Sequence, residues 1–150
     1  MPKYVIDTNL YVHALRDPDA RDALRSFTAA SSPWIYVHAV VAAELLAGAP
    51  DPRMEEAIQT SFLAPFEAMG RVIVPRHDAW KRAGRTIGEL IREHRLSANG
   101  VKPSFFRDCL LATSARDEGI TIITGNTRDF ELIRTVEPVK FVPPWPGSER

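Results

Sequence analysis

Short apolar segments recur along the chain in a way that predicts buried β-strands. Four of them lie at residues 4–6, 34–37, 72–74 and 121–123. Each is rich in β-branched or aromatic side chains and is apolar on successive residues, which is typical of a sheet covered on both faces. A fifth candidate strand, residues 139–142, ends at Pro143 and Pro144.

Between these segments the apolar residues follow helical spacing. We expect helices over residues 19–30, 40–47, 54–66, 78–94 and 105–118. Ser104 is the expected N-cap of the last helix, and Gly119 follows directly after its end. Strands that alternate with helices indicate right-handed crossovers, so the pattern predicts a three-layer α/β/α sandwich with a mainly parallel central sheet.

The length of 150 residues fits one domain. We predict a domain over residues 1–142 and a proline-rich, mobile tail over residues 143–150. Asp7 lies where a signal peptide would need an apolar run, and the most apolar stretch, residues 35–49, is too short to span a bilayer. A cytoplasmic protein is therefore expected.

Charge and cysteine content narrow the function. Nineteen basic and nineteen acidic residues give a formal net charge of zero, which excludes binding of nucleic acid through bulk positive charge. Any such contact must be local, through a patch or a metal site. The single cysteine, Cys109, excludes a disulfide framework and a cysteine-based zinc site, and we interpret it as a small core residue.

Two further groups of residues are given structural interpretations. The histidines, at positions 13, 38, 77 and 94, show no ligand spacing and are expected at or near the surface. Residues 80–85, Trp-Lys-Arg-Ala-Gly-Arg, combine an aromatic ring with basic side chains. That combination suits RNA, but a solvated helix face is the interpretation we favour.

Four carboxylates carry the candidate chemistry. Asp7 follows the first strand and Asp129 lies shortly after the fourth, and ligands of open α/β sheets bind at the carboxyl ends of strands. Each of these two is also compatible with a simple helix cap. Glu44 and Asp108 share helical faces with apolar residues, where a carboxylate is costly unless it is paired or bound to a metal. The alternatives are a partner arginine or a surface position for Glu44, and a helix cap for Asp108.

Taken together, the four acids indicate a cation. Carboxylates crowded in one crevice repel one another, and a divalent ion relieves that repulsion. Oxygen ligands without a Cys or His cluster select Mg²⁺ or Mn²⁺. Acids that hold such ions are a common arrangement for phosphodiester hydrolysis, so the residues predict a metal-dependent phosphoryl-transfer site.

Four motifs, in order and at matching spacing, resemble those of PIN-domain nucleases. They occupy residues 5–9 (Val-Ile-Asp-Thr-Asn), 43–48 (Ala-Glu-Leu-Leu-Ala-Gly), 108–115 (Asp-Cys-Leu-Leu-Ala-Thr-Ser-Ala) and 121–130 (Thr-Ile-Ile-Thr-Gly-Asn-Thr-Arg-Asp-Phe). Within the family, a free-standing domain of this size is most similar to VapC-type toxins of toxin–antitoxin pairs. The resemblance implies a homodimeric endoribonuclease that depends on Mg²⁺ or Mn²⁺ and is inhibited by a small antitoxin.

The resemblance also implies roles for individual residues. The metal-site acids would be Asp7, Glu44, Asp108 and Asp129, and the supporting polar residues would be Asn9, Thr124 and Asn126. Two features depart from the family pattern. Arg107 stands where the family often has Asn, and it either contacts a substrate phosphate of the RNA or lies on the surface. The segment 95–106 is longer than in compact relatives.

Other functions fit less well. Haloacid dehalogenases need a second Asp two residues after the first, where this chain has Asn9, and receiver domains need a Lys that Thr124-Gly125-Asn126 does not supply. A non-catalytic binding module would not need four mutually repelling acids. A PIN nuclease acting outside toxin–antitoxin control, in RNA maturation or on DNA, remains open. The apolar surplus of residues 54–66 predicts that this helix contributes to a homodimer.

Overall fold

A five-stranded parallel sheet runs through the middle of the molecule. The structure, a computed structural model, describes residues 2–147 of the chain. The strands are β1 (Lys3–Ile6), β2 (Ile35–His38), β3 (Val72–Ile73), β4 (Ile120–Ile123) and β5 (Phe141–Val142), in the order β3-β2-β1-β4-β5. Every pairing between neighbours is parallel, and β1 is the central strand. The five predicted strands and the parallel sheet are confirmed.

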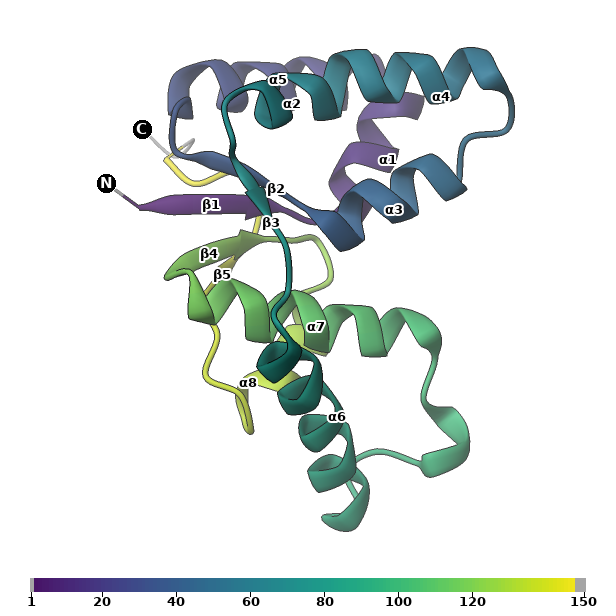
Figure 1. Cartoon of the computed structure of the whole chain (residues 1–150), viewed down its shortest axis with the longest axis vertical. Helices are drawn as coiled ribbons and strands as arrows, with labels where there is room; N and C mark the ends of the chain where they lie inside the picture. The colour runs from purple at the N-terminus through teal and green to yellow at the C-terminus, as the bar shows by residue number, and fades with distance from the viewer. Residues whose placement is uncertain (1, 148–150) are drawn as a thin grey trace.

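Helices cover both faces of the sheet (Figure 1). One face carries α1 (Thr8–Arg16), α2 (Pro18–Ser31), α3 (Ala39–Ala47), α4 (Pro52–Ile58) and α5 (Ala64–Ala68). The other face carries α6 (His77–Arg92), α7 (Pro103–Asp117) and α8 (Thr127–Arg134). The predicted three-layer α/β/α architecture is therefore confirmed.

The two layers have separate cores because successive strand residues point to opposite faces. Val5 packs with the apolar side chains of α6, α7 and α8, whereas Ile6 packs with those of α1 to α5. Both side chains are fully buried. This explains why the strands are apolar on successive residues.

Two short helices, α1 and α8, were not predicted. Each begins within a few residues of the end of a strand, at residues that belong to the candidate site: Asp7 occupies the N-cap position of α1, and Asn126 that of α8. The sequence indicated these helices only through the alternative interpretation of Asp7 and Asp129 as helix caps, although both segments also place apolar residues at helical spacing.

The predicted helix over residues 54–66 is split. It consists of α4, a π-helical turn (Gln59–Leu63) and α5. Pro65 lies in the first turn of α5 and has no N–H to donate, so a regular α-helical ladder cannot run through it. Ile58, Leu63 and Phe66 are buried inside the chain, so the apolar surplus that suggested a dimer contact is used in the core.

The start of α7 also differs from the prediction. The helix begins at Pro103, and Lys102 occupies the N-cap position without a side-chain cap. Ser104 is therefore inside the first turn and is not the N-cap. Proline is well suited to this first position because its missing N–H would have no partner there. The end of the helix is as predicted, with Gly119 at a positive φ of 65°.

His38 corrects the expectation that all four histidines lie near the surface. It is completely buried, its Nε2 lies 2.6 Å from Ser114 Oγ, and its Nδ1 accepts a hydrogen bond from the Val40 amide at 3.0 Å. Because Nδ1 is an acceptor, the proton of the neutral ring is on Nε2, which donates to Ser114. Burial lowers the pKa of His38 to about 4.

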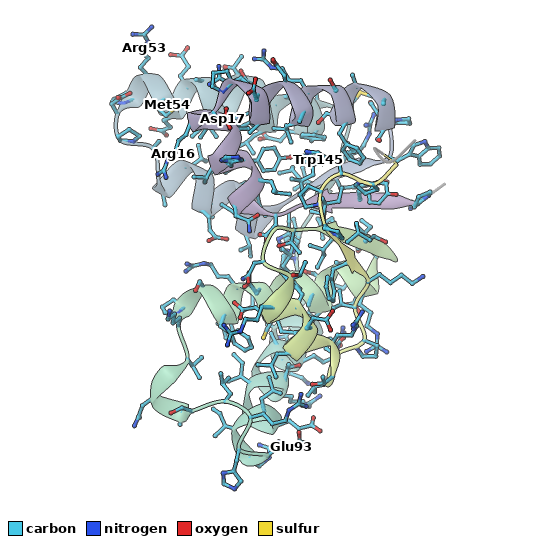
Figure 2. The ribbon with its side chains drawn as sticks, turned by 180° about the vertical axis from the view of Figure 1, so that it is seen from behind. Arg16, Asp17, Arg53, Met54, Glu93 and Trp145 are labelled. Atoms are coloured by element: carbon cyan, nitrogen blue, oxygen red, sulfur yellow. The ribbon has the colours of Figure 1, made fainter. Side chains whose placement is uncertain are left out.

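The first part of the 143–150 tail packs on the domain. The Trp145 ring stacks on Phe27 of α2 with centroids 5.2 Å apart, on the face of the sheet that α2 covers (Figure 2). Trp145 therefore packs on the domain, and the mobility expected for the tail stays a prediction. Residues 148–150 lie outside the described part of the chain, and the division at residue 142 stays a prediction.

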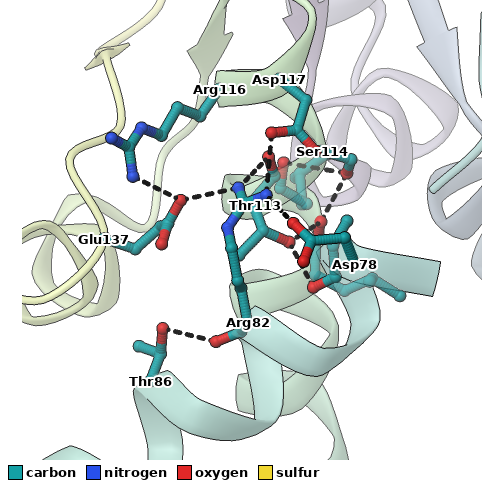
Figure 3. A network of polar contacts seen from close by, with 11 residues as sticks. Asp78, Arg82, Thr86, Thr113, Ser114, Arg116, Asp117 and Glu137 are labelled. Carbon is teal, nitrogen blue, oxygen red and sulfur yellow. Dashed lines mark hydrogen bonds and ion pairs between the residues drawn. The ribbon is translucent and has the colours of Figure 1, made fainter. Parts of the chain in front are cut away.

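An arginine network joins α6 and α7 to the segment before β5 (Figure 3). Arg82 Nη1 lies 2.8 Å from Asp78 and 2.9 Å from Asp117, and its Nη2 donates to Glu137 at 2.8 Å. Arg116 also pairs with Glu137, at 3.0 Å.

Among the helices of residues 2–147, none is long and apolar enough to cross a membrane.

Candidate active site

A polar cavity of about 420 Å³ opens beyond the carboxyl ends of β1 and β4. Asp7, Glu44 and Asp108 line it, which brings together three of the four predicted acids from three separate elements. The other polar side chains in its wall are those of Thr8, Asn9, His13, Arg16, Ser104 and Asn126. The topology causes this convergence, because parallel strands end at the same edge of the sheet.

Asp7 is held by both of its carboxylate oxygens. Oδ1 accepts from the Thr8 amide at 2.7 Å, and Oδ2 accepts from Thr124 Oγ1 at 2.8 Å. The Asp7 amide donates to the Ile123 carbonyl at 2.9 Å, which ties the ends of β1 and β4 together. Asp7 therefore occupies a helix N-cap position, as the alternative interpretation expected, and also lines the cavity.

Glu44 projects from α3 toward α1 and α7. Its Oε1 accepts a hydrogen bond from Thr8 Oγ1 at 3.1 Å, and its Oε2 lies 3.1 Å from Arg107 Nε. The arginine partner considered as an alternative for Glu44 is therefore present. Arg107 is not simply a surface residue, because its Nε is buried in this contact.

Asp108 lies in the second turn of α7, so it does not cap the helix. The side chain of Asn126 joins Asp108 to Asp129. Its Nδ2 donates to Asp129 Oδ2 at 2.8 Å and lies 3.4 Å from Asp108 Oδ2. Asp129 is in the first turn of α8. Asn126 lines the cavity, whereas Asp129 is not among the lining residues. Thr124 Oγ1 fixes this loop by accepting from the Asn126 amide at 2.9 Å.

Burial and the nearby negative charges shift the pKa values of the carboxylates in the site. Burial is the main cause that raises the pKa of Asp108 to about 8. The negative charges around it, those of Asp7, Asp129 and Glu44, raise this pKa further. Burial also raises the pKa of Asp7, although hydrogen bonds from Thr124 and Thr8 offset part of the rise. Such crowding of carboxylates is what a bound cation would relieve.

The donor chemistry suits a hard divalent ion, although the side chains are not yet arranged around one. Within residues 2–147, no three Asp, Glu, His or Cys side chains are placed so that they could hold a metal ion as they stand. The carboxylates in the cavity nevertheless offer the oxygen donors that Mg²⁺ and Mn²⁺ prefer. Arg107 is the side chain that a cation would have to compete with at Glu44.

Sequence reasoning missed several polar residues of the cavity. Thr8 donates to Glu44 through its hydroxyl and to Asp7 through its amide, and Ser104 also lines the cavity. A signal for Thr8 was present, because it directly follows Asp7 within the first motif. Ser104 gave no such signal, since its expected role was that of a cap. Asn9 lines the cavity, and its supporting role stays a prediction.

Known proteins resemble this chain over most of its length. The model of the PIN domain family matches residues 4–135. Among curated proteins, the tRNA(fMet)-specific endonuclease VapC of Shigella flexneri is 28% identical over 134 residues, which cover 89% of this chain and 93% of that protein.

Solved structures share the fold. The DNA-bound VapBC complex from Salmonella typhimurium contains a chain that is similar with a TM-score of 0.71 and 21% identity, covering 95% of this chain and 98% of that one. A chain of FitAcB from Neisseria gonorrhoeae matches with a TM-score of 0.66 and 18% identity, over 95% of this chain and 98% of that one.

Proposed function

This chain belongs to the PIN-domain family, and on that basis we propose that it is a divalent-metal-dependent endoribonuclease and the toxin of a toxin–antitoxin pair. One observation carries the catalytic part of the proposal. Three acids line a single cavity at the strand ends, and Asp108 is pushed toward its protonated form by burial and by the charges of Asp7, Asp129 and Glu44.

In this proposal Asp7, Glu44 and Asp108 hold Mg²⁺ or Mn²⁺, and Asp129 assists directly or through water. The ion, when bound, supplies positive charge for the scissile phosphate and activates water. The remaining residues orient the acids: Thr124 and Thr8 fix Asp7, and Asn126 fixes Asp129 against Asp108. Asn9 is a polar support at the rim, and Arg107 contacts a phosphate of the RNA once it leaves Glu44.

The curated relative supports RNA as the substrate class, because it is named a tRNA(fMet)-specific endonuclease. The partner is a small antitoxin protein, since the similar chains come from structures described as VapBC and FitAcB assemblies. Both proteins would act in the cytoplasm. Expression of this chain alone should slow growth. A small open reading frame is expected beside its gene, and co-expression of that antitoxin should restore growth.

We also propose that the chain forms a homodimer, but through a surface different from residues 54–66. Met69, Val72 and Val74 are exposed apolar side chains at and around β3, which is an edge strand of the sheet. Grouped exposed apolar residues at a sheet edge are typical of an interface between chains.

Nuclease assays on the purified protein test the catalytic proposal. A transfer RNA, an unstructured RNA and a duplex DNA are each incubated with Mg²⁺, with Mn²⁺ or with excess EDTA. We expect RNA cleavage that EDTA abolishes and either ion restores. The Asp108→Asn variant, purified in the same way, controls for contaminating nucleases. Cleavage that persists in EDTA, or that is confined to DNA, would contradict the proposal.

A further inference from the structure

A second cavity, of about 490 Å³, borders the acidic cavity and shares Glu44 with it. Its floor is aliphatic and is formed by Val40, Ala43 and Ala47 of α3 and by Leu110 of α7. Its lining residues come from α3, from the first turn of α6 and from α7. α6 follows β3 along the chain, and its start lies beside α7 (Figure 1). Its volume falls within the range of about 300–1,000 Å³ that is usual for small-ligand sites.

Two aromatic rings form one side of this cavity. Trp80 and Phe106 both line it, with ring centroids 6.0 Å apart and planes inclined by 39°. Trp80 is 48% exposed, which is more than any other Phe, Tyr or Trp residue within residues 2–147. An exposed indole beside an apolar floor offers a flat ligand a face on which to stack.

Basic side chains are frequent in the sequence around Trp80, although the whole chain is neutral. Arg76, Lys81 and Arg85 are exposed on and next to the first turns of α6, as is the acidic Asp78. Arg107 lines the cavity beside Glu44, with which it pairs. An anionic ligand is therefore favoured over a second copy of this chain, because a two-fold axis through this patch would bring its cations together.

We infer that this cavity is the subsite for an unpaired nucleobase of the RNA, on the nucleotide next to the phosphate that enters the acidic cavity; this rests on the proposed function. The base stacks on Trp80 and Phe106, and Arg107 faces the phosphate that links the two positions. Stacking on an aromatic platform beside basic residues is a general mode of single-strand recognition. Residues 80–85 are then a substrate surface and not only a solvated helix face.

Nuclear magnetic resonance of the indole N–H groups tests the subsite directly. The full chain is kept in EDTA, so that no cleavage occurs, and is titrated with AMP, with UMP and with ribose 5-phosphate. We expect both nucleotides to shift the Trp80 signal, and ribose 5-phosphate, which lacks a base, to leave it in place. The signals of Trp34 and Trp145, which lie outside the cavity, serve as internal controls.

Binding of a short fluorescent single-stranded RNA, measured by anisotropy in EDTA, gives the second readout. Trp80→Ala should weaken binding about ten-fold, as expected for the loss of one stacked base. Trp80→Phe should retain most of the affinity because it keeps a ring, and Trp34→Phe should bind like the wild type. Circular dichroism shows whether each variant is folded.

The inference and the proposed function fail in different ways. Equal shifts with ribose 5-phosphate, or wild-type RNA binding by a folded Trp80→Ala variant, would overturn the nucleobase subsite while leaving metal-dependent cleavage intact. A third combination would also overturn the subsite: AMP leaves the wild-type Trp80 signal unshifted, and the Trp80→Ala variant sediments as a monomer. The patch would then be a contact between copies of the chain. Absence of cleavage with Mg²⁺ or Mn²⁺ would instead contradict the nuclease proposal.

Discussion

The protonation of Asp108 couples the stability of the metal-free protein to pH. Its pKa rises from an ordinary value of 3.8 to about 8 in the folded chain. Between these values the folded state holds a proton that the unfolded state has lost, so the free energy of unfolding decreases as the pH rises through this window. The stabilising effect of the proton is fully present below about pH 4.

Asp108→Asn should therefore stabilise the metal-free protein. At about 1.4 kcal/mol per pKa unit, the gain in free energy of unfolding should be of the order of 5 kcal/mol above pH 8. It should vanish below about pH 4, because Asn cannot ionise. The same variant should lose about 10²–10³ in cleavage rate, since it removes one charged group at the reacting phosphate. Urea unfolding in EDTA across this pH range, together with cleavage assays in Mg²⁺, measures both quantities.

Asp22→Asn, on the exposed face of α2, is the matched control and should change neither quantity. We expect the same pair of effects, higher stability and lower activity, for Asp7→Asn, although that residue also caps α1. If these variants cleaved RNA normally but melted earlier, the acids would be structural caps and the site assignment would be wrong.

His38 has the opposite dependence on pH. Its pKa falls from an ordinary value of 6.5 to about 4 because the ring is buried. The unfolded chain therefore binds a proton that the folded chain rejects, and stability is lost as the pH falls from about 6.5 toward 4. A difference of this size corresponds to a loss of the order of 3 kcal/mol.

Replacing His38 by Asn should reduce the loss of unfolding free energy between pH 6.5 and pH 4, which we call the acid limb of the stability curve. The variant should be less stable at pH 7, because the bond to Ser114 is lost, but should not weaken further between pH 6.5 and 4 on account of this residue. Urea unfolding of the variant and of the exposed control His94→Asn gives the comparison. An acid limb that is unchanged in His38→Asn would show that another group causes it.

At the scale of elements, the Arg82 network determines how α6, α7 and the segment before β5 fit together. Hydrogen bonds to Glu137, Asp78 and Asp117 raise the pKa of Arg82 above its ordinary value, so it remains charged. Glu137 is only 6% exposed, and its carboxylate is satisfied by Arg82 and Arg116. Removal of Arg82 would leave a buried carboxylate with a single partner.

Arg82→Gln should consequently cost about 3 kcal/mol of unfolding free energy, the usual result of breaking a buried ion pair from one side. Arg85→Gln, three residues along the same helix and exposed, should cost less than about 0.5 kcal/mol. The double variant Arg82→Gln with Glu137→Gln should regain part of the loss, because no charge is then left unpaired. Equal effects at Arg82 and Arg85 would rule out this role for the network.

The elements also show what a sequence can predict here. The buried strands were found because their apolar runs are set by burial on both faces, and the acids at their ends because parallel topology brings strand ends together. The break at Pro65 and the start of α7 at Pro103 depend on backbone hydrogen bonds that apolar spacing does not reveal. The pairing of Glu44 with Arg107, and the burial of His38, depend on side chains that lie far apart in the sequence.

At the scale of the whole molecule, the exposed apolar side chains around β3 lead to a prediction about assembly. Val74 is 67% exposed, and Val74→Glu should convert a dimer into a monomer because it places a charge in the proposed interface. Sedimentation at tens of micromolar measures this. Thr60→Glu, on the exposed side of the π-helical turn, should remain dimeric. A wild-type protein that sediments as a monomer would contradict the dimer but not the nuclease.

The tie between Asp7 and Thr124 has a consequence for protein synthesis. The two residues are 117 positions apart, and Thr124 is the hydrogen-bond partner of one of the two Asp7 carboxylate oxygens. A ribosome that has added only the first hundred residues has made Asp7 and Glu44 but neither β4, which pairs with β1, nor Asp108. The acidic cavity therefore cannot form on a nascent or prematurely terminated chain. If the protein cuts RNA as proposed, an incomplete copy is released without the means to cut the RNA that encodes it.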